Sequence, residues 1–309
     1  MQLTREHLVW AYRLFLDREP ESEVVIKRQL QGLSSVKELR RQFVNSAEFR
    51  SQVEVIASSD KCNIVIKEIA EHLRLFVDLS DTHIGWNIVN DSYEPEEREF
   101  VVQALDDRAT AIDVGANIGF FTMVMAKRVG AHGHVYAFEP LPRNTSLLTR
   151  SVSENNFDSR VTVSQAAVGD QPGQMELLSL ILTNNWGGPY LRTGNLPVPP
   201  DHEVTMVPVV HLDGCALRRP IKLIKVDAEG AEMLVVQGAK GLLRDDRPTV
   251  LAEINRKQLA AVSACSPTDL IGEMSRLGYS CSPLVQRNLP STLNTYESDE
   301  IINVVFSPK

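Results

Sequence analysis

The sequence has few of the residues that hold small exported or metal-bound folds together. Among its 309 residues there are four cysteines, and no two of them form a C-x-x-C pair. Such wide spacing favours reduced thiols over a disulfide framework or a cysteine zinc site. The four are Cys62, Cys215, Cys265 and Cys281. We therefore expect a reducing compartment.

Long apolar runs are also missing. The longest one, over residues 118–126, is interrupted by Gly119 and Thr122, whereas a bilayer span needs roughly 20 apolar residues in succession. Residues 5–7, Arg-Glu-His, stand where a signal peptide has its apolar segment. These features predict no membrane span and a cytoplasmic location.

Basic residues are fewer than acidic ones: the sequence has 32 Lys and Arg residues and 40 Asp and Glu residues, and its net charge is −8. This balance argues against a nucleic-acid binder that relies on a broad basic face. Residues 1–50 carry nine basic and seven acidic residues, and the other 259 carry 23 and 33. The acidity therefore belongs to the larger part of the chain. A hydrophobic content of 43% is ordinary for a folded protein and excludes a disordered one.

The first 50 residues have helical patterning. Apolar residues recur at helical spacing over 8–16, and Glu19-Pro20 ends that pattern. Two further amphipathic stretches follow at 22–30 and 34–43. With Ser58-Ser59-Asp60 as a linker, we expect a small all-α domain over residues 1–58 and a second domain over 59–309.

From Thr110 onward, strands alternate with helices, which predicts a parallel sheet covered on both faces. We expect strands at 110–114, 134–138, 161–165, 221–226 and 249–254, and helices at 119–129, 142–155, 231–243 and 267–277. Two closing segments, Tyr279–Pro283 and Ile301–Phe306, have no helix between them and should pair antiparallel at the sheet edge. An insertion over about 170–220, rich in Gly, Pro and Asn, is a candidate substrate loop.

The sharpest motif is A-I-D-V-G-A-N-I-G, residues 111–119. A strand runs into a glycine turn and then a helix, so Gly115 and Gly119 let the backbone come close to a ligand. A dinucleotide fingerprint would have a glycine where Asn117 stands. Glu139 ends the next strand, where a carboxylate can accept hydrogen bonds from both hydroxyls of an adenosine ribose. The pattern predicts a nucleoside ligand smaller than a dinucleotide.

These residues, together with K-V-D-A-E-G-A-E (225–232) and N-V-V-F-S-P (303–308), closely resemble the FkbM family of S-adenosylmethionine-dependent methyltransferases over residues 80–309. The resemblance implies a class I, Rossmann-like methyltransferase fold: an α/β protein with a seven-stranded, mostly parallel sheet whose last strand is antiparallel. It also implies methyl transfer to an oxygen atom of a sugar or another secondary metabolite.

The resemblance also assigns cofactor-binding residues. It implies that the amino-acid end of S-adenosylmethionine lies at the glycine turn, the ribose at the next strand end, and the adenine along the strand end that follows. The residues implied for the amino-acid end are Asp113, Gly115, Asn117 and Gly119. Glu139 is implied for the ribose, and Gln165 and Ala166, with Ala167, are implied for the adenine.

A hydroxyl acceptor must lose its proton, which requires a base or an acidifying metal. Asp227 ends the fourth strand, Glu229 starts the next turn, and Glu253 and Asn255 end the fifth strand. Two interpretations stay open. Asp227, Glu253 and Asn255 are a candidate Mg²⁺ site. Alternatively, Asp227 holds the cofactor's ammonium group or acts as the base, and Glu229 organises the turn. His83 is a further candidate base.

The insertion contains T-N-N-W-G-G-P-Y, residues 183–190. Asn185, Trp186 and Tyr190 combine an amide with aromatic rings, which suits stacking on a sugar while hydrogen-bonding its hydroxyls. We therefore list them as candidate substrate contacts, with an incidental surface loop as the alternative.

The sequence predicts an O-methyltransferase acting on a sugar, a glycan precursor or a related metabolite. The alternatives are an N-methyltransferase for a small amine and a non-catalytic cofactor-binding scaffold. The text YRLFLDREP, residues 12–20, resembles a helical module attached to bacterial enzymes that handle surface glycans. Residues 1–58 are thus a candidate docking or dimerisation domain. The acceptor, its regiochemistry and the oligomeric state are not specified by the sequence.

Overall fold

The computed structural model describes residues 3–16, 18–33, 35–44, 46, 48, 63–180, 188–194, 198–285 and 301–309. Contacts divide the chain into two compact units. One comprises Met1–Ile64 and Asp78–Ser80, and the other comprises Val65–Val77 and Asp81–Lys309. Among the described residues, no helix combines the length and the apolar character that crossing a membrane requires.

In its described residues, the N-terminal unit contains three short helices around a small core. They are α1 (Arg5–Leu16), α2 (Glu23–Gly32) and α3 (Val36–Val44). The Ser22 side chain accepts a hydrogen bond from the Val25 amide and caps α2. The rings of Tyr12 and Phe43 meet edge to face at 4.8 Å and are buried with apolar residues of all three helices. The helical pattern expected for this part of the chain is confirmed.

The larger unit is built on a seven-stranded sheet with the order β12-β13-β11-β10-β3-β4-β5. Its strands are β3 (Thr110–Val114), β4 (His134–Phe138), β5 (Val161–Ser164), β10 (Ile221–Val226), β11 (Thr249–Ile254), β12 (Tyr279–Pro283) and β13 (Ile302–Pro308). Strands β11, β10, β3, β4 and β5 are parallel to one another, and β13 pairs antiparallel with both β11 and β12. The expected strands and the antiparallel last strand are confirmed.

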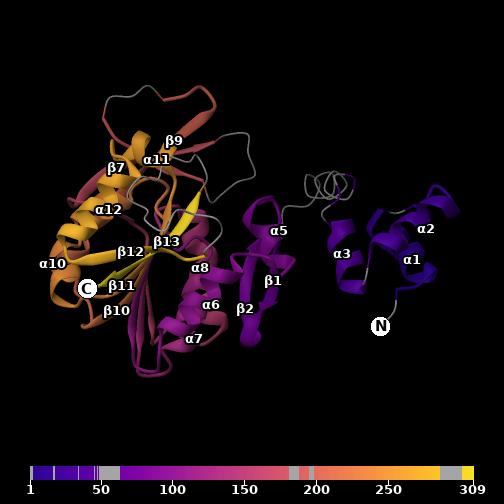
Figure 1. Cartoon of the computed structure of the whole chain (residues 1–309), viewed down its shortest axis with the longest axis horizontal. Helices are drawn as coiled ribbons and strands as arrows, with labels where there is room; N and C mark the ends of the chain where they lie inside the picture. Colours follow the sequence, from indigo (N-terminus) through magenta and orange to yellow (C-terminus); the bar gives the residue numbers. More distant parts are fainter. Residues whose placement is uncertain are drawn as a thin grey trace. The chain divides into compact units, whose positions relative to one another are not determined.

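Helices cover both faces of this sheet, with α10 and α12 on one side and α6, α7 and α8 on the other (Figure 1). The helices are α5 (Ile84–Val89), α6 (Pro95–Ala104), α7 (Phe120–Arg128), α8 (Pro142–Glu154), α9 (Glu232–Gln237), α10 (Lys240–Asp245), α11 (Arg256–Val262) and α12 (Pro267–Arg276). The single helix expected over 231–243 is two helices, because the chain turns at Gly238-Ala239. Helix α11 was not expected from the sequence.

The insertion over about 170–220 is not simply a loop. It contributes to a second sheet, with the order β6-β9-β7-β8. Its strands are β6 (Ala167–Val168), β7 (Gly173–Leu180), β8 (Tyr190–Arg192) and β9 (His202–Val210). The two long strands, β7 and β9, pair antiparallel over their whole length, from Gly173 with Val209 to Leu180 with His202. Strands β1 (Ile64–Ile69) and β2 (Leu73–Asp78) form a separate two-stranded sheet, and the 3-10 turn η1 (Ala70–His72) connects them. A second 3-10 turn, η2 (Leu212–Gly214), precedes β10.

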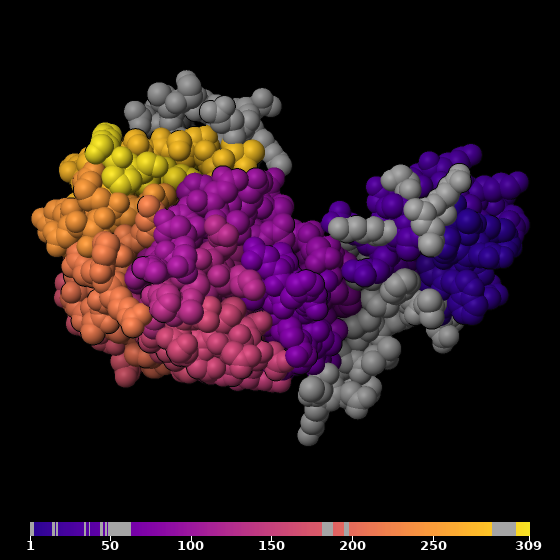
Figure 2. All heavy atoms as spheres, turned by 90° about the horizontal axis from the view of Figure 1, so that it is seen from below, coloured from indigo at the N-terminus to yellow at the C-terminus, as the bar shows by residue number. Residues whose placement is uncertain are grey.

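The main core lies along the centre of the seven-stranded sheet. All five residues of β3 are buried, as expected for a parallel strand covered on both faces. One large cluster of buried side chains joins β3 and β10 to helices α9 and α12. Figure 2 shows the atoms of the large unit packed as one continuous body. The core therefore holds the carboxyl ends of β3, β4, β10 and β11 at one edge of the sheet.

Candidate functional site

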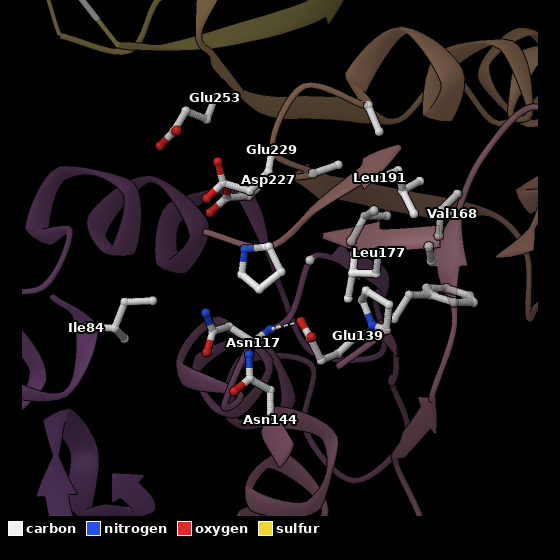
Figure 3. A pocket seen from close by; sticks show the side chains of 18 of the residues that line it. Ile84, Asn117, Glu139, Asn144, Val168, Leu177, Leu191, Asp227, Glu229 and Glu253 are labelled. Carbon is white, nitrogen blue, oxygen red and sulfur yellow. Dashed lines mark hydrogen bonds between the residues drawn. The ribbon is translucent and has the colours of Figure 1, made fainter. Parts of the chain in front are cut away.

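A cavity of about 450 Å³ opens at this edge, within the volume range typical of small-molecule sites. It is lined by residues that follow β3, β4 and β10, and by residues of β6, β7, β8 and helix α5. Open α/β sheets bind ligands at the carboxyl ends of their strands. The cavity has a mostly apolar side, with Val168, Leu177 and Leu191, and an end rich in carboxylates (Figure 3).

The glycine turn after β3 brings two strand ends into contact. Gly115 has a φ of +76°, and a Cβ atom on it would lie 1.7 Å from the carbonyl oxygen of Asp227. The Asp227 amide donates to the carbonyl of Val114 at 3.0 Å. Gly119 also has a positive φ, +96°, and a Cβ there would lie 2.4 Å from Leu148 Cδ1. The motif thus needs glycine for packing as well as for turning.

Glu139 is held at the end of β4 by backbone amides. Its carboxylate accepts from the amide of Asn117 at 2.9 Å and from that of Leu141 at 2.8 Å. Burial raises the pKa of Glu139 to about 7, against the lowering effect of those two amides. The side chain is 6% exposed but lines the cavity. The Asn144 side chain is a third hydrogen-bond donor to this carboxylate. Of its roughly four lone-pair positions, about one therefore remains for a ligand.

A buried ion pair lies under the opposite end of the cavity. Lys225 Nζ lies 3.1 Å from Asp227 Oδ2 and 4.6 Å from the centre of the Phe121 ring. Burial acts to lower the pKa of Lys225, but nearby carboxylates, first Asp227 and then Glu94, outweigh it and raise the pKa. Lys225 is therefore a permanent cation beneath the carboxylate end of the cavity.

Three further carboxylates gather at this end. Figure 3 shows Glu229 and Glu253 there with Asp227. Burial, followed by the charge of Asp227, raises the pKa of Glu229 to about 8 and that of Glu253 to about 9. Glu94 lines the same cavity, and burial raises its pKa to about 7. Because like charges in a low-dielectric pocket cannot all ionise, this end binds protons at neutral pH.

The turn that carries Asp227 and Glu229 is shaped by Glu232. Its carboxylate accepts from the amides of Ala228 and Gly230, both at 3.1 Å. Glu229 itself has a φ of +49° and accepts a hydrogen bond from the Gln258 side chain on α11. Organising the turn, a role expected for Glu229, thus falls mainly to Glu232.

Most of the predicted site residues are brought together. Those that line the cavity are His83, Gly115, Asn117, Glu139, Ala166, Asp227, Glu229 and Glu253. Asp113 lies beneath it, where Oδ2 accepts from the Thr122 hydroxyl at 2.6 Å and Oδ1 has no partner in the described part of the chain. Asp113 lines a second, far smaller cavity with Lys225 and Asp227. Gly119 and Gln165 line neither cavity.

The predicted substrate contacts are only partly described. Asn185 and Trp186 lie outside the described residues. On β8, Leu191 lines the cavity and Tyr190 does not, because neighbouring side chains of a strand point to opposite faces. The Tyr190 hydroxyl instead lies 3.3 Å from Nε2 of His202.

The predicted Mg²⁺ site is not assembled. Asn255 is the N-cap of α11, and its Oδ1 accepts from the amides of Lys257 and Gln258 at 3.1 and 3.4 Å. This oxygen therefore caps the helix, and the structure does not support Asn255 as a metal ligand. In the described residues, no three Asp, Glu, His or Cys side chains are grouped so that they could hold a metal ion.

Sequence reasoning missed Tyr93 and Glu94, which line the cavity just before α6. Pro95 stands at the first helical position of α6, where proline is favoured. Nothing in the spacing indicated that the residues before it reach the ends of strands more than 100 positions later. Only the fold places them there.

The strand order, the antiparallel β13 beside β11, and the cavity at the parallel strand ends together define the class I, Rossmann-like methyltransferase fold. Comparison with known proteins narrows the class to a family. The sequence model of the Methyltransferase FkbM domain matches residues 113–281. The chain belongs to this FkbM methyltransferase family.

Individual relatives are more distant. "Methyltransferase 1" of Beauveria bassiana (strain ARSEF 2860) is 31% identical over 157 residues, which is 44% of this chain and 61% of that protein. The chain thus spans less than two thirds of this relative's length. A methyltransferase FkbM from Methylobacillus flagellatus KT is similar with a TM-score of 0.40 and 18% identity, over 73% of this chain and 55% of the other. M. jannaschii TYW2, solved with AdoMet, has a TM-score of 0.43 and 14% identity, over 81% and 89%.

Proposed function

We propose that the chain is an S-adenosylmethionine-dependent O-methyltransferase that acts on a hydroxyl of a sugar, a glycan precursor or a related secondary metabolite. The observation that carries this proposal is the cavity with Glu139 at one end and Asp227, Glu229 and Glu253 at the other. One end suits the ribose of the methyl donor. The other suits its positively charged part and a hydroxyl acceptor.

The residues present fit S-adenosylmethionine. Glu139 lines the cavity and retains about one lone-pair position for a ribose hydroxyl. Phe138, Ala166 and Val168 provide an apolar wall for an adenine ring. At the far end, Asp227 favours a cation because opposite charges attract strongly where water is excluded. When bound, S-adenosylmethionine supplies an activated methyl group on a positively charged sulfur. The protein has to align that methyl group with the acceptor and accept the acceptor's proton.

Several groups are positioned to serve the acceptor. His83, at the start of α5, and Asp227 and Glu229, after β10, line the cavity together. We propose that Asp227 binds the cationic part of the methyl donor, since Lys225 already holds one of its oxygens. Glu229 and His83 remain as contacts for the acceptor. In the described residues no metal-binding group supplements them.

A second candidate function is methylation of a small amine. The carboxylate-rich end favours it, because the Asp227 carboxylate would attract a protonated amine. An amine needs no strong base once it is deprotonated, so substitution of a single carboxylate would reduce its methylation only mildly.

The experiment has two stages. Isothermal titration of the full chain with S-adenosylmethionine should show binding. The variant E139Q should bind about 10–100-fold more weakly because a charge-assisted hydrogen bond is lost, and E203Q, an exposed site on β9, should bind normally. No binding by the unmodified chain at millimolar ligand would support the scaffold alternative and overturn the proposal.

In the second stage, S-adenosylhomocysteine formation is followed with a panel of free sugars, aminosugars and nucleotide sugars. Assays run with and without EDTA. Mass spectrometry and NMR of the product then locate the new methyl group. An O-methyl product would support the proposal, and an N-methyl product would support the second candidate.

We further propose that residues 1–58 form a docking or dimerisation domain and that the protein works in the cytoplasm. Trp10 is 56% exposed on α1, with the Arg13 guanidinium 5.4 Å from its ring centre. The three described cysteines, Cys215, Cys265 and Cys281, are free thiols, which suits a reducing compartment. Light scattering of the chain and of W10A would test self-association: a mass that W10A does not change would argue against a dimer through α1.

A further inference from the structure

The carboxylates at the cavity's acidic end differ in how far they are already occupied. Asp227 is held by Lys225 at 3.1 Å, and Glu229 accepts from Gln258. At the other end, Glu139 accepts two backbone amides. Among the described residues, Glu94 and Glu253 are the other carboxylates that line the cavity. Glu94 accepts one hydrogen bond, from the neighbouring Tyr93 side chain. A base must be able to exchange its proton with the acceptor, so an oxygen with few fixed donors is favoured.

Glu94 is held in a conformation that local structure does not explain. It stands at the N-cap position of α6 with φ 39° and ψ 61°, in the left-handed region. A glutamate there costs about 1–2 kcal/mol relative to ordinary backbone. Its side chain makes no capping hydrogen bond to the helix and lines the cavity instead. Such strain at a cavity wall points to a function for the side chain.

The polar and charged groups around Glu94 come from the residue before it, from α6, from β10 with the turn after it, and from β11. The side chain of Tyr93, the preceding residue, hydrogen-bonds the Glu94 carboxylate. Glu97 lies on α6, and Lys225 and Asp227 lie on β10 and the turn that follows it. Burial raises the pKa of Glu94 to about 7, with Lys225 acting against it. The pKa of Glu253 rises to about 9, and Glu94 is among the causes. At neutral pH, Glu253 is therefore protonated and Glu94 is close to half ionised.

We propose that Glu94 is the catalytic base of the methyl transfer. This inference rests on the proposed function. The acceptor hydroxyl gives its proton to the Glu94 carboxylate, and the oxygen's electron pair forms the bond to the methyl carbon. The electron pair of the broken carbon–sulfur bond stays on sulfur, which becomes neutral. Glu94 precedes the segment matched by the family, residues 113–281.

The proposal has a consequence that needs no acceptor. A positively charged sulfur near Glu94 favours its ionised form, so binding of S-adenosylmethionine should expel a proton. At pH 7 the contribution of Glu94 should be up to about half a proton, because the group is half protonated beforehand. S-adenosylhomocysteine has a neutral sulfur and should expel less. Titration calorimetry in buffers of different ionisation enthalpy measures both numbers.

The test compares the full chain with E94Q, E94D and E99Q. Glu99 is an exposed residue of α6 whose partner is Gln103, so E99Q should match the unmodified chain. E94Q should bind S-adenosylmethionine but lose the extra proton release. With the acceptor found in the screen, its kcat/KM should fall about 10²–10⁴-fold, and the rise of kcat/KM through pH 7 should disappear. E94D should retain that rise.

Two results would overturn the assignment of Glu94 as the base. One is a kcat/KM of E94Q equal to that of the unmodified chain, and the other is a proton release on S-adenosylmethionine binding that is the same in E94Q. If E94Q does not fold, E94D decides, because a structural role would not preserve the dependence on pH. Failure of the unmodified chain to bind S-adenosylmethionine would overturn the proposed function itself. An N-methylated product with only a mild effect of E94Q would leave methyl transfer intact and remove Glu94 as the base.

Discussion

Position 115 requires glycine for two reasons. Its φ of +76° is disfavoured for residues that carry a Cβ atom, and the carbonyl oxygen of Asp227 occupies the space that a Cβ atom would need. Substitution by alanine would push β3 and β10 apart at the cavity floor. The pair Lys225–Asp227 would move with them, because Asp227 is bonded through its amide to Val114. Stability and ligand binding should therefore fail together at this position.

We expect G115A to lower stability by about 3 kcal/mol, or about 6–12 °C in Tm, and to abolish measurable S-adenosylmethionine binding. G272A is the matched control. Gly272 lies within α12, and a Cβ there meets no atom within 4 Å, so alanine should stabilise the helix by about 0.5–1 kcal/mol. Differential scanning calorimetry and titration measure both variants. Normal ligand binding by G115A would contradict the role given to this turn.

At the scale of residues, the sequence predicted those that belong to continuous motifs. Gly115, Asn117 and Glu139 follow strand ends, and parallel strand ends meet at one edge of a sheet. The sequence predicts the role of a residue less well when that role depends on the structure around it. Asn255 ends a strand, as a ligand would, but the next residue starts a helix that needs its oxygen as a cap.

Helix α11 bears on the Mg²⁺ hypothesis because its N-cap is Asn255, one of the proposed ligands. The Asn255 side chain satisfies two amides of the first turn, and such a cap contributes about 1 kcal/mol. If this is its role, any side chain that caps should replace it.

N255A should lower the free energy of unfolding by about 1 kcal/mol and leave S-adenosylmethionine affinity and activity almost unchanged. N255D should restore stability, since aspartate is an equally good N-cap. Urea denaturation followed by circular dichroism measures the stability. A large loss of activity in N255A that added Mg²⁺ reverses would revive the metal site.

The elements of the large sheet were predicted well because each strand is a short apolar run between helices. The second sheet was not, although β7 and β9 are eight and nine residues long. Glycine, proline and asparagine between these strands obscured them. Their pairing, Gly173 with Val209, spans 36 positions, and no local pattern reports a partner at that separation.

For the molecule as a whole, the carboxylates at the strand ends tie stability to pH. Burial raises the pKa values of Glu139 and Glu232 to about 7, of Glu229 to about 8 and of Glu253 to about 9. Each group binds its proton more tightly in the folded state than in the unfolded one. The contribution of each is therefore complete below about pH 4.5 and is lost as the pH rises through the folded value.

The ligand-free protein should thus melt at a lower temperature at pH 9 than at pH 6. E253Q, which cannot ionise, should flatten the upper part of this decline. Scanning fluorimetry from pH 6 to 9 measures it, and S-adenosylmethionine should reduce the slope by adding positive charge at the same end. A Tm that rises over this interval would contradict the placement of these groups.

The two compact units of the chain lead to a separate prediction. Because the helical unit has its own core around Tyr12 and Phe43, residues 59–309 should fold and bind S-adenosylmethionine without it, with affinity within about threefold of the whole chain. Titration of the shortened chain tests this. An insoluble or non-binding product would show that the helices support the larger unit.

The position of β13 has a consequence for synthesis. This strand, Ile302–Pro308, lies between β11 and β12, although translation reaches it after every other strand of the sheet. Until then, the growing chain presents the backbone of β11 with no neighbour on that side, next to apolar residues such as Leu251 and Ile254. Unpaired edges of this kind recruit other strands. A nascent chain that lacks β13 should therefore be prone to pair with other strands through β11.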